Sequence, residues 1–356
     1  MAAYGLYAQL NADVLRAHGV TQILGPEAEA DLVALATGGA TPASGAAIPR
    51  LAFVTPDRRA LPPLARYAAL QMPDGTRRVV GATDATRGCK HRCRHCPIVP
   101  VYDGVFRVVP LEVVLADVEQ QVAAGASHIS FGDPDFFNGP AHARRIVEAL
   151  HARWPHVTYD VTIKIEHLLA HRKLLPVLAS TGCLFVTTAV EAVDDAILEK
   201  LEKGHTREDF IAAVSCAREA GLTLAPTFVA FTPWTTIDGY RDLLATVAAL
   251  DLIDHVAPVQ WGLRLLVTQG SRLLELEDVR ARLAAFDPES LTYPWRHADP
   301  EVDALQARIT RLVGVNLTRP RAALFRAVCE LAGLPVGMAV MPARATIPYL
   351  NEPWYC

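Results

Sequence analysis

After residue 78 the spacing of apolar residues switches repeatedly between two periods. Short runs rich in β-branched and aromatic side chains predict strands, and longer stretches with apolar residues three or four positions apart predict helices. The predicted strands are 79–86, 128–131, 157–165, 183–190, 222–231 and 255–266, and the predicted helices are 110–124, 139–154, 167–181, 194–201, 206–220 and a segment ending at 250. Strands separated by helices of this length indicate parallel βα units and therefore an α/β fold.

The two flanks of this alternating region have a different pattern. Before it, 10–18 and 27–36 predict helices with a short strand at 21–24 between them. After it, 299–312 and 320–332 predict two helices that cover the opening or an edge of the core. We therefore expect an N-terminal extension at 1–78, a core at 79–275 and a C-terminal helical region with a tail at 276–356.

Composition and charge narrow the class of protein. The 356 residues are 51% hydrophobic and 20% charged, which is enough for a packed core, and the net charge of −4 argues against a general nucleic-acid binder. No apolar run reaches the roughly 18 residues that a membrane span needs, and Met1–Ala17 lacks the pattern of a signal peptide. Seven cysteines without a secretion signal favour a cytoplasmic protein, and the abundant Ala, Arg and Pro suggest a bacterial genome.

Three cysteines, Cys89, Cys93 and Cys96, have C-x3-C-x2-C spacing directly after Arg87-Gly88. Thiolates this close in sequence can surround one metal centre only from an irregular loop, because the side chains of a helix cannot wrap around a cluster. Thiolate ligands select zinc, Cu(I) or iron–sulfur clusters. A [4Fe–4S] cluster normally takes four cysteines, and no fourth cysteine is near, so one iron would be left for a substrate.

Two other interpretations of these cysteines remain open. A structural zinc site could complete its ligands with His91 or His95, although such sites more often pair two C-x2-C turns. A disulfide would leave one of the three cysteines over, and nothing marks the protein as secreted. Cys183, Cys216 and Cys329 lie in apolar segments, so we expect them to be buried as small hydrophobic residues.

The cysteine motif and the order of elements after it resemble the radical SAM superfamily. The resemblance implies that Cys89, Cys93 and Cys96 hold three irons of a [4Fe–4S] cluster, and that S-adenosyl-L-methionine chelates the fourth. One electron from the cluster would then cleave a carbon–sulfur bond, usually giving a 5′-deoxyadenosyl radical. It also implies a partial (β/α)6 TIM-like barrel with an N-terminal α/β extension and a C-terminal helical cap. Flavodoxin or ferredoxin would be the electron donor.

Chemistry in such a barrel lies at the carboxyl ends of the strands. Gly132-Asp133-Pro134-Asp135 follows the second predicted strand, where many members of the family have a Gly-Gly-Glu motif that receives the amino group of the cofactor. A short turn with carboxylates suits an ammonium donor. We therefore expect Gly132, Asp133 and Asp135 to bind the cofactor, with an ordinary Asx-Pro turn as the alternative.

The next two strands also end in charged residues. Lys164 and Glu166 alternate onto one face after the third strand, where a polar substrate or the ribose of the cofactor would pair with them; an ion pair on the outer rim is the alternative. Glu191 has the acidic position of the family's G-x-E-S region, although Ala192 replaces the serine. The resemblance implies that Glu191 binds ribose hydroxyls or the amino acid part of the cofactor. We expect the Lys203-Gly204-His205 segment to be structural.

Two further positions complete the strand ends. Phe228 ends the fifth strand, where members of the family often hold adenine by backbone groups and apolar contacts. Arg264 lies on the sixth strand and could hold a carboxylate bidentately, or it could be an ordinary surface residue.

The N-terminal extension resembles the end of the cobalamin-binding domain that precedes some radical SAM domains. The likeness lies in GVTQILGPEAEADLVAL at 19–35 and LPPLARY at 61–67. A whole cobalamin domain needs a longer α/β segment, and often a D-x-H-x-x-G motif, which this sequence lacks. We therefore expect a shortened remnant that binds no cobalamin.

The C-terminal sequence IPYLNEPWYC ends in Cys356. With the rest of the chain it resembles the CUAEP/CCAEP-tail radical SAM proteins, which end in a Cys-Cys or Cys-selenocysteine pair followed by Ala-Glu-Pro. A selenocysteine codon read as a stop, or a truncation, would explain a chain that stops at the first cysteine. Such a pair would be a redox site, so Cys356 joins Lys164 and Arg264 as a candidate catalytic residue; a merely exposed cysteine is the alternative.

The function expected from these features is radical chemistry on a small molecule, because no RNA-binding or peptide-binding domain is visible. Neither nucleic acid nor a membrane is an expected partner. Three alternatives stay open: a cobalamin-dependent radical methyltransferase, a variant that makes a 3-amino-3-carboxypropyl radical, and a zinc-bound interaction module without enzymatic activity.

Overall fold

A computed structural model describes residues 1–39, 48, 51–334 and 345–351. Within these residues each helix is too short or too polar to cross a lipid bilayer. The chain forms two compact units, each made of three stretches of sequence. Unit 1 comprises Met1–Val54, Gly88–Phe106 and Leu266–Arg296, and unit 2 comprises Thr55–Arg87, Arg107–Leu265 and His297–Cys356.

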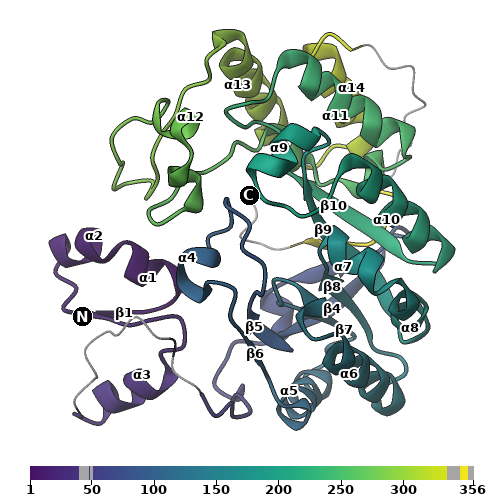
Figure 1. The fold of residues 1–356 in the computed structure, drawn as a ribbon. Coiled ribbons are helices and arrows are strands. Elements are labelled where there is room, and N and C mark those ends of the chain that lie inside the picture. Colours follow the sequence, from purple (N-terminus) through teal and green to yellow (C-terminus); the bar gives the residue numbers. More distant parts are fainter. Residues whose placement is uncertain (40–47, 49–50, 335–344, 352–356) are drawn as a thin grey trace. The chain divides into compact units, whose positions relative to one another are not determined.

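A seven-stranded sheet forms the centre of unit 2. Five strands are parallel, and two short antiparallel strands, β3 (Ala69–Gln71) and β11 (Tyr349–Asn351), complete one edge. The parallel strands are β4 (Arg77–Thr83), β7 (His128–Phe131), β8 (Thr158–Thr162), β9 (Cys183–Glu191) and β10 (Thr223–Phe228), in the order β10-β9-β8-β7-β4. Figure 1 labels these five strands. The predicted fold class, a partial barrel of parallel βα units, is confirmed.

Helices follow the parallel strands along the chain of unit 2. They are α5 (Leu111–Ala123), α6 (Pro140–Arg153), α7 (Ile165–Ala170), α8 (Leu175–Ser180), α9 (Asp195–Lys200), α10 (Arg207–Glu219) and α11 (Ile237–Ala249). The starts of α10 and α11 have local causes, because the Thr206 and Thr236 side chains accept hydrogen bonds from backbone N–H groups of the first turn. Such caps fix where each helix leaves the strand end before it.

The two faces of the sheet carry different side chains. Gly81 pairs with Ile129 and Ile129 with Tyr159, and a Cβ on Gly81 would come within 2.5 Å of Gln121 on α5, so this row is the outer, helix-covered face. Ile129 and Tyr159 are fully buried there. The next row, Ala82, Ser130 and Asp160, lies on the opposite, inner face. Ala82 and Ser130 are small, which leaves room beside this part of the inner face.

Two predicted elements are wrong. The predicted sixth strand, 255–266, is instead two short 3-10 helices, η4 (Ile253–His255) and η5 (Pro258–Gly262), with one parallel bridge from Arg264 to Phe231. Pro258 has no N–H to give to a ladder and favours the start of a turn. The predicted helix at 167–181 is broken into α7, a 3-10 turn and α8, because Pro176 begins a new helix.

The C-terminal helices of unit 2 pack on the segment that replaces the sixth strand. They are α13 (Pro300–Gly314) and α14 (Arg321–Leu331). The Gln306 amide on α13 donates to the Gly262 carbonyl at 3.0 Å, and the ring of Phe325 on α14 lies 5.1 Å from that of Trp261. A hydrogen bond and a ring contact from these two helices therefore hold the segment after β10, where the sequence predicted a further strand.

Unit 1 is smaller and has short elements. Strands β1 (Ala2–Ala3) and β2 (Gln22–Ile23) pair in parallel. The predicted helix 10–18 is present as the shorter helix α2, and α1 precedes it. The two helices meet at Asn11, whose side chain donates to the Tyr7 carbonyl at 3.0 Å. The helices of unit 1 are α1 (Leu6–Leu10), α2 (Ala12–Ala17), α3 (Glu29–Ala36), α4 (Val99–Tyr102) and α12 (Glu277–Arg280), with the 3-10 helix η6 (Arg272–Glu275). Strands β5 (Thr86–Gly88) and β6 (Phe106–Val108) lie where the chain passes between the units.

Candidate active site

The three clustered cysteines lie in an irregular loop of unit 1 between β5 and α4. Cys93 is buried, whereas Cys89 and Cys96 are half-buried, and no disulfide joins any cysteine in the described part of the chain. The Cys96 amide donates to the Cys93 carbonyl at 3.2 Å, which turns the backbone between these two residues. The loop geometry that the spacing predicts is therefore present.

Neighbouring residues of unit 1 hold the backbone of this loop. Arg272 donates to the Arg92 carbonyl at 2.7 Å, and the Ser271 hydroxyl donates to the Arg94 carbonyl at 3.2 Å. Glu275 pairs with Arg272 at 3.0 Å and lies 3.7 Å from Arg94. Two backbone carbonyls between Cys89 and Cys96 are thus fixed by side chains that come from the start of η6.

Gly88 begins the cysteine loop with φ +77°. A Cβ at this position would collide with the ring of Tyr102 and with the Val105 carbonyl. A left-handed backbone and a close approach both require glycine here, so the turn into the cysteine loop depends on it.

In unit 2 the Asp133 carboxylate accepts hydrogen bonds from the segment that leads to the cysteine loop. It is 2% exposed, and it accepts hydrogen bonds from the Ala85 amide at 2.8 Å and from the Thr86 hydroxyl at 2.5 Å. The Gly132 amide donates to the Thr83 carbonyl at 2.9 Å, which continues the ladder between β4 and β7. Asp133 therefore positions the segment that follows β4.

The environment of Asp133 predicts an unusual dependence of stability on pH. Burial raises the pKa of this carboxyl to about 7, although the hydrogen bonds from Thr86 and Ala85 act in the opposite direction. An aspartate in the unfolded chain titrates near pH 4, so between pH 4 and 7 the folded state binds more protons than the unfolded state. The free energy of unfolding therefore falls as the pH rises through this window and levels off above it.

We expect Asp133→Asn to remove this dependence. Between pH 4.5 and 7.5 the wild type should lose roughly 3–4 kcal/mol of unfolding free energy relative to the variant, as urea unfolding at the two pH values would measure. Other groups that titrate in the same range, such as His205, cancel in the difference. Parallel pH profiles for the two proteins would contradict the raised pKa.

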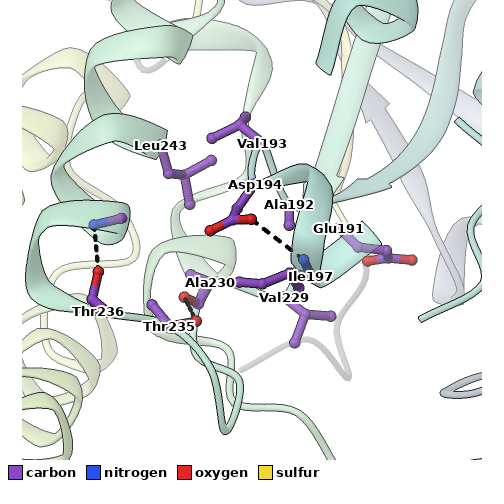
Figure 2. A pocket seen from close by; sticks show the side chains of 11 residues that line it. Glu191, Ala192, Val193, Asp194, Ile197, Val229, Ala230, Thr235, Thr236 and Leu243 are labelled. Atoms are coloured by element: carbon purple, nitrogen blue, oxygen red, sulfur yellow. Dashed lines mark hydrogen bonds between the residues drawn. The ribbon is translucent and has the colours of Figure 1, made fainter. Parts of the chain in front are cut away.

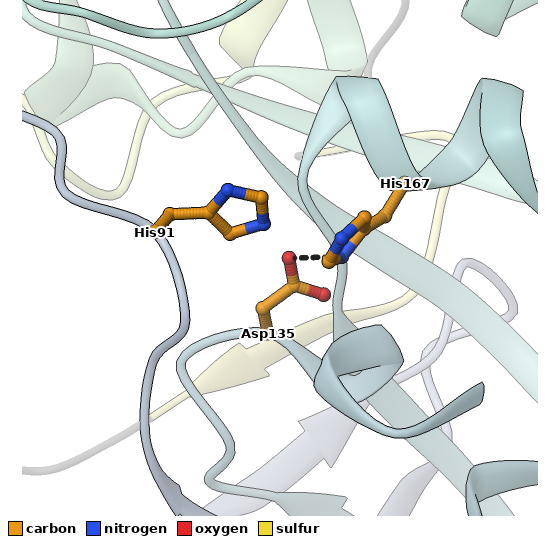
Figure 3. A group of neighbouring side chains, drawn as sticks. All are labelled: His91, Asp135 and His167. Atoms are coloured by element: carbon orange, nitrogen blue, oxygen red, sulfur yellow. Dashed lines mark ion pairs between the residues drawn. The ribbon is translucent and has the colours of Figure 1, made fainter. Parts of the chain in front are cut away.

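Asp135 caps the 3-10 turn η2 (Phe136–Asn138) and meets a histidine. Its carboxylate accepts from the Phe137 amide at 3.0 Å, and its other oxygen lies 2.7 Å from Nδ1 of His167 on α7, as Figure 3 shows. Both side chains are buried. The cap is thus made by Asp135, and its pair with His167 joins the ends of β7 and β8.

A second charged cluster lies at the ends of β8 and β9. Lys164 pairs with Glu166 at 3.1 Å, and Glu191 pairs with Lys203 at 3.3 Å. A Cβ on Gly204, where φ is +72°, would come within 2.8 Å of the Glu166 carboxylate and 3.5 Å of the Lys164 ammonium. The loop after α9, expected to be structural only, therefore packs directly against the predicted strand-end charges.

Glu191 and His205 have unusual states within this second cluster. Glu191 ends β9 with φ +70°, a left-handed conformation that costs energy for any residue with a Cβ. Burial, and then the neighbouring cations Lys203 and Lys164, lower the pKa of His205 to about 4, so its imidazole is neutral at pH 7. The cluster thus gathers two carboxylates, two ammonium groups and a neutral imidazole.

The space beside Ala192 and Asp194 is small. A cavity of about 20 Å³ lies there, which is room for about one water molecule. Figure 2 shows Glu191 and the other side chains that line it. Asp194 caps α9 by accepting from the Ala196 amide at 2.8 Å.

The remaining predicted residues have partners within the protein. The Phe228 ring packs edge-on against Phe210 of α10 on the outer side of the sheet, and its amide donates to the Gln260 side chain at 2.9 Å. Arg264 donates to Asp303 of α13 at 2.7 Å. Cys183 and Cys329 are buried as expected and Cys216 is half-buried, while Cys356 lies outside the described residues.

Sequence comparisons place a known domain over the cysteine loop and the first strand ends. Residues 84–238 match the Radical SAM superfamily. The tRNA-2-methylthio-N(6)-dimethylallyladenosine synthase of Fusobacterium nucleatum is 28% identical over 179 residues, which cover 46% of this chain and 39% of that protein. Hopanoid C-3 methylase of Methylococcus capsulatus is 24% identical over 160 residues, which cover 45% and 30% of the two chains. The matched segment spans well under half the length of either relative.

The fold has similar solved structures as well. The apo, selenomethionine-labelled form of the cobalamin-dependent S-adenosylmethionine radical enzyme OxsB aligns with a TM-score of 0.60 and 15% identity, over 89% of this chain and 58% of that one. The form with aqua-cobalamin and S-adenosylmethionine aligns with a TM-score of 0.56 over 67% and 41%. At this identity the likeness concerns the fold alone. The sequence match shows that residues 84–238 carry a radical SAM superfamily domain, and proteins with this domain are enzymes.

Proposed function

We propose that Cys89, Cys93 and Cys96 hold a [4Fe–4S] cluster, with which the enzyme cleaves S-adenosyl-L-methionine reductively to start radical chemistry on a small molecule. The observation that carries this proposal is the donor set: three thiols at C-x3-C-x2-C spacing in an irregular loop. A soft, three-thiolate set suits an iron–sulfur cluster with one iron open to a ligand. The match of residues 84–238 to the superfamily supports it.

The chemistry of the site divides between the cofactors and the chain. The reduced cluster would supply one electron, which breaks a carbon–sulfur bond of the sulfonium. The chain holds the cluster loop through Arg272 and Ser271, and it fixes the approach to that loop through Asp133. Fixed geometry of this kind lets ligands meet a metal without further rearrangement of the backbone.

The cluster of charges at the ends of β8 and β9 supports binding of the nucleoside and amino acid parts of the cofactor. Glu166 and Glu191 offer carboxylate oxygens to a vicinal diol, as acidic residues do for ribose in other nucleotide sites. Lys164 pairs with Glu166, whose side chain is partly exposed, and Lys203 pairs with Glu191, which is buried. His205, neutral at pH 7, adds polarity without adding charge.

Methyl transfer that depends on cobalamin is the second candidate. OxsB is cobalamin-dependent by its title, and one curated relative is a methylase by its name. The described part of residues 1–54 contains a two-stranded sheet, β1 and β2. Cobalt content after reconstitution with cobalamin separates the two candidates.

Several finer features belong to the same proposal. The electron donor would be a flavodoxin or ferredoxin, the location cytoplasmic and the source bacterial, and neither nucleic acid nor a membrane would be a partner. The resemblance to the CUAEP/CCAEP-tail proteins, and with it a selenocysteine after Cys356, stays a prediction, because Cys356 lies outside the described residues. Genomic DNA just past the Cys356 codon tests it.

Anaerobic purification followed by product analysis tests the proposal. We expect a brown protein with iron and sulfide, which releases 5′-deoxyadenosine and methionine when dithionite and S-adenosylmethionine are added. Methylthioadenosine in place of 5′-deoxyadenosine would instead indicate a 3-amino-3-carboxypropyl radical. A colourless protein with stoichiometric zinc would contradict the proposal and favour an interaction module.

A further inference from the structure

We propose that a cavity beside β4 in unit 2 is the substrate pocket, and that it takes an uncharged, largely apolar organic molecule with one hydrogen-bond donor. This inference rests on the proposed function and adds the substrate class to it. The cavity has a volume of about 720 Å³, within the range of pockets that enclose small organic ligands. It is bounded by residues 58–68, by the end of α5 and by the inner face of β4 and β7.

The cavity exists because one edge of β4 is closed by a side chain instead of a strand. β3 pairs only with Arg77–Val79, so it ends before Ala82. The Gln121 amide of α5 accepts from the Ala82 N–H at 2.7 Å and donates to the Ala82 carbonyl at 3.1 Å. One side chain therefore satisfies the backbone that another strand would have used, and the space next to the inner face stays open.

Both cations that border the cavity are already neutralised. Arg58 makes a bidentate pair with Asp117, at 2.5 and 2.8 Å, and also donates to the Ala82 carbonyl. Arg59 makes a bidentate pair with Asp57, at 2.9 and 2.6 Å. An anionic ligand would lose its hydration here without gaining a counter-charge. Burial raises the pKa of the Asp84 carboxyl next to Gly132, which favours its neutral form, so the cavity favours an uncharged ligand.

Most of the wall is apolar, and the inner face contributes small residues. Aliphatic and aromatic side chains come from Leu61, Leu64, Tyr67, Val80 and Leu350. Ala82 and Gly132 are two small residues that line the cavity. A rigid apolar body fits such a wall, because contact with it removes apolar surface from water.

One polar atom on the inner face is prepared to accept a hydrogen bond. The Ser130 hydroxyl, which borders the cavity, donates to Asp160 at 3.1 Å. Asp160 is held in turn by Nε2 of His128 at 2.9 Å, and Nδ1 of His128 lies 2.8 Å from the Thr158 hydroxyl. Because the Ser130 hydroxyl donates its proton to Asp160, the lone pairs of the Ser130 oxygen can accept a hydrogen bond from an O–H or N–H group of a ligand. Asp160 is thus a positioning residue for Ser130.

The cavity also reaches the predicted cofactor motif. Gly132 borders it and begins the Gly132-Asp133-Pro134-Asp135 turn, whose Asp133 holds Ala85 and Thr86 just ahead of the cysteine loop. A molecule in the cavity therefore touches the turn that we expect to bind the cofactor. This continuity favours a substrate over a structural lipid or a stray solvent molecule.

Fluorescence of the neutral dye prodan tests the apolar character of the cavity, with the anionic dye 8-anilinonaphthalene-1-sulfonate as comparison. Ala82→Phe fills the cavity and should weaken prodan binding at least about tenfold, whereas wild type should bind the anionic dye less tightly than prodan. Ala212→Phe is the control: this residue lies at an exposed position on α10, outside the residues that line the cavity, and should leave prodan binding unchanged. Prodan binding that is kept in Ala82→Phe, equal loss of binding in Ala82→Phe and Ala212→Phe, or tighter binding of the anionic dye would overturn the proposal.

A matched ligand pair tests the role of Ser130. 2-Naphthol carries a hydroxyl donor and 2-methoxynaphthalene does not. In wild type, 2-naphthol should displace prodan with an affinity at least about threefold higher than that of 2-methoxynaphthalene. Ser130→Ala should abolish this difference in affinity. Equal displacement by the two compounds in wild type would remove the hydrogen-bond donor from the proposed ligand class.

Two design choices keep these tests decisive. If Ala82→Phe shows no cooperative thermal transition, Ala124→Phe, at an exposed position bordering the same cavity, provides the result. Dye binding is measured without reductant or S-adenosylmethionine. If prodan does not bind as predicted, the products of S-adenosylmethionine cleavage can still be measured. If cleavage is not observed, the dye-binding result remains valid, so the two proposals can fail separately.

Discussion

Replacing Cys93 by alanine is expected to remove the brown chromophore and lower the iron content from about four atoms per chain to less than one. Cys93 is the most buried of the three clustered thiols, at 7% exposed, and it lies between the other two in sequence. With two thiolates left, a cubane cluster would have only half of its usual protein ligands. Iron and sulfide assays with the visible spectrum, all under anaerobic conditions, measure this.

A control substitution separates loss of a ligand from loss of a cysteine in general. Cys216→Ala alters a half-buried thiol on α10, and it should leave iron, sulfide and colour unchanged. A Cys93→Ala protein that keeps its iron would show that Cys93 is no ligand. Loss of iron in both variants would show that the cluster depends on general stability and not on this loop.

Glu191→Gln is expected to have the second large effect, on both stability and cofactor binding. The side chains of Glu191 and Lys203 are 9% and 3% exposed, so neutralising the carboxylate leaves a buried ammonium without its partner. Breaking a buried pair in this way costs about 3–5 kcal/mol of unfolding free energy. S-adenosylmethionine should also bind more weakly, because the proposed diol acceptor has lost its charge. Urea unfolding and equilibrium dialysis measure the two effects.

The double variant Glu191→Gln/Lys203→Met distinguishes these two roles. Removing both charges should restore most of the stability, because no uncompensated ion remains in the buried site. Binding of S-adenosylmethionine should stay weak. Recovery of binding together with stability would mean that Glu191 acts on the fold alone.

The sequence alone predicted the parallel strands well, because each is a short apolar run between helices of regular period. β7 was predicted at its observed bounds, 128–131. The prediction of a sixth strand was wrong. The 255–266 segment is apolar enough for a strand, but Pro258 starts a 3-10 turn and α13 donates a hydrogen bond to the Gly262 carbonyl. Tertiary packing decided between two structures that local propensity could not separate.

The candidate site was predictable where its signal is local. The spacing of Cys89, Cys93 and Cys96 in the sequence indicates a metal site. By contrast, Lys203 pairs with Glu191 although 12 residues and a helix separate them, so no local pattern indicates this contact. One local feature could have indicated that this loop packs closely against the charged residues: an isolated glycine, Gly204, which can mark a close backbone approach. The cavity beside β4 had no signal at all, because its walls come from residues 58–68, 120–124, 130–132 and 350.

The account depends most on an iron that the polypeptide leaves for the amino acid end of S-adenosylmethionine. Electron–nuclear double resonance of the reduced, reconstituted enzyme measures this directly, with S-adenosylmethionine carrying ¹⁵N in its amino group and ¹⁷O in its carboxylate. We predict hyperfine coupling of both labels to the cluster. A reduced cluster that shows neither coupling while the cofactor is bound would contradict the account.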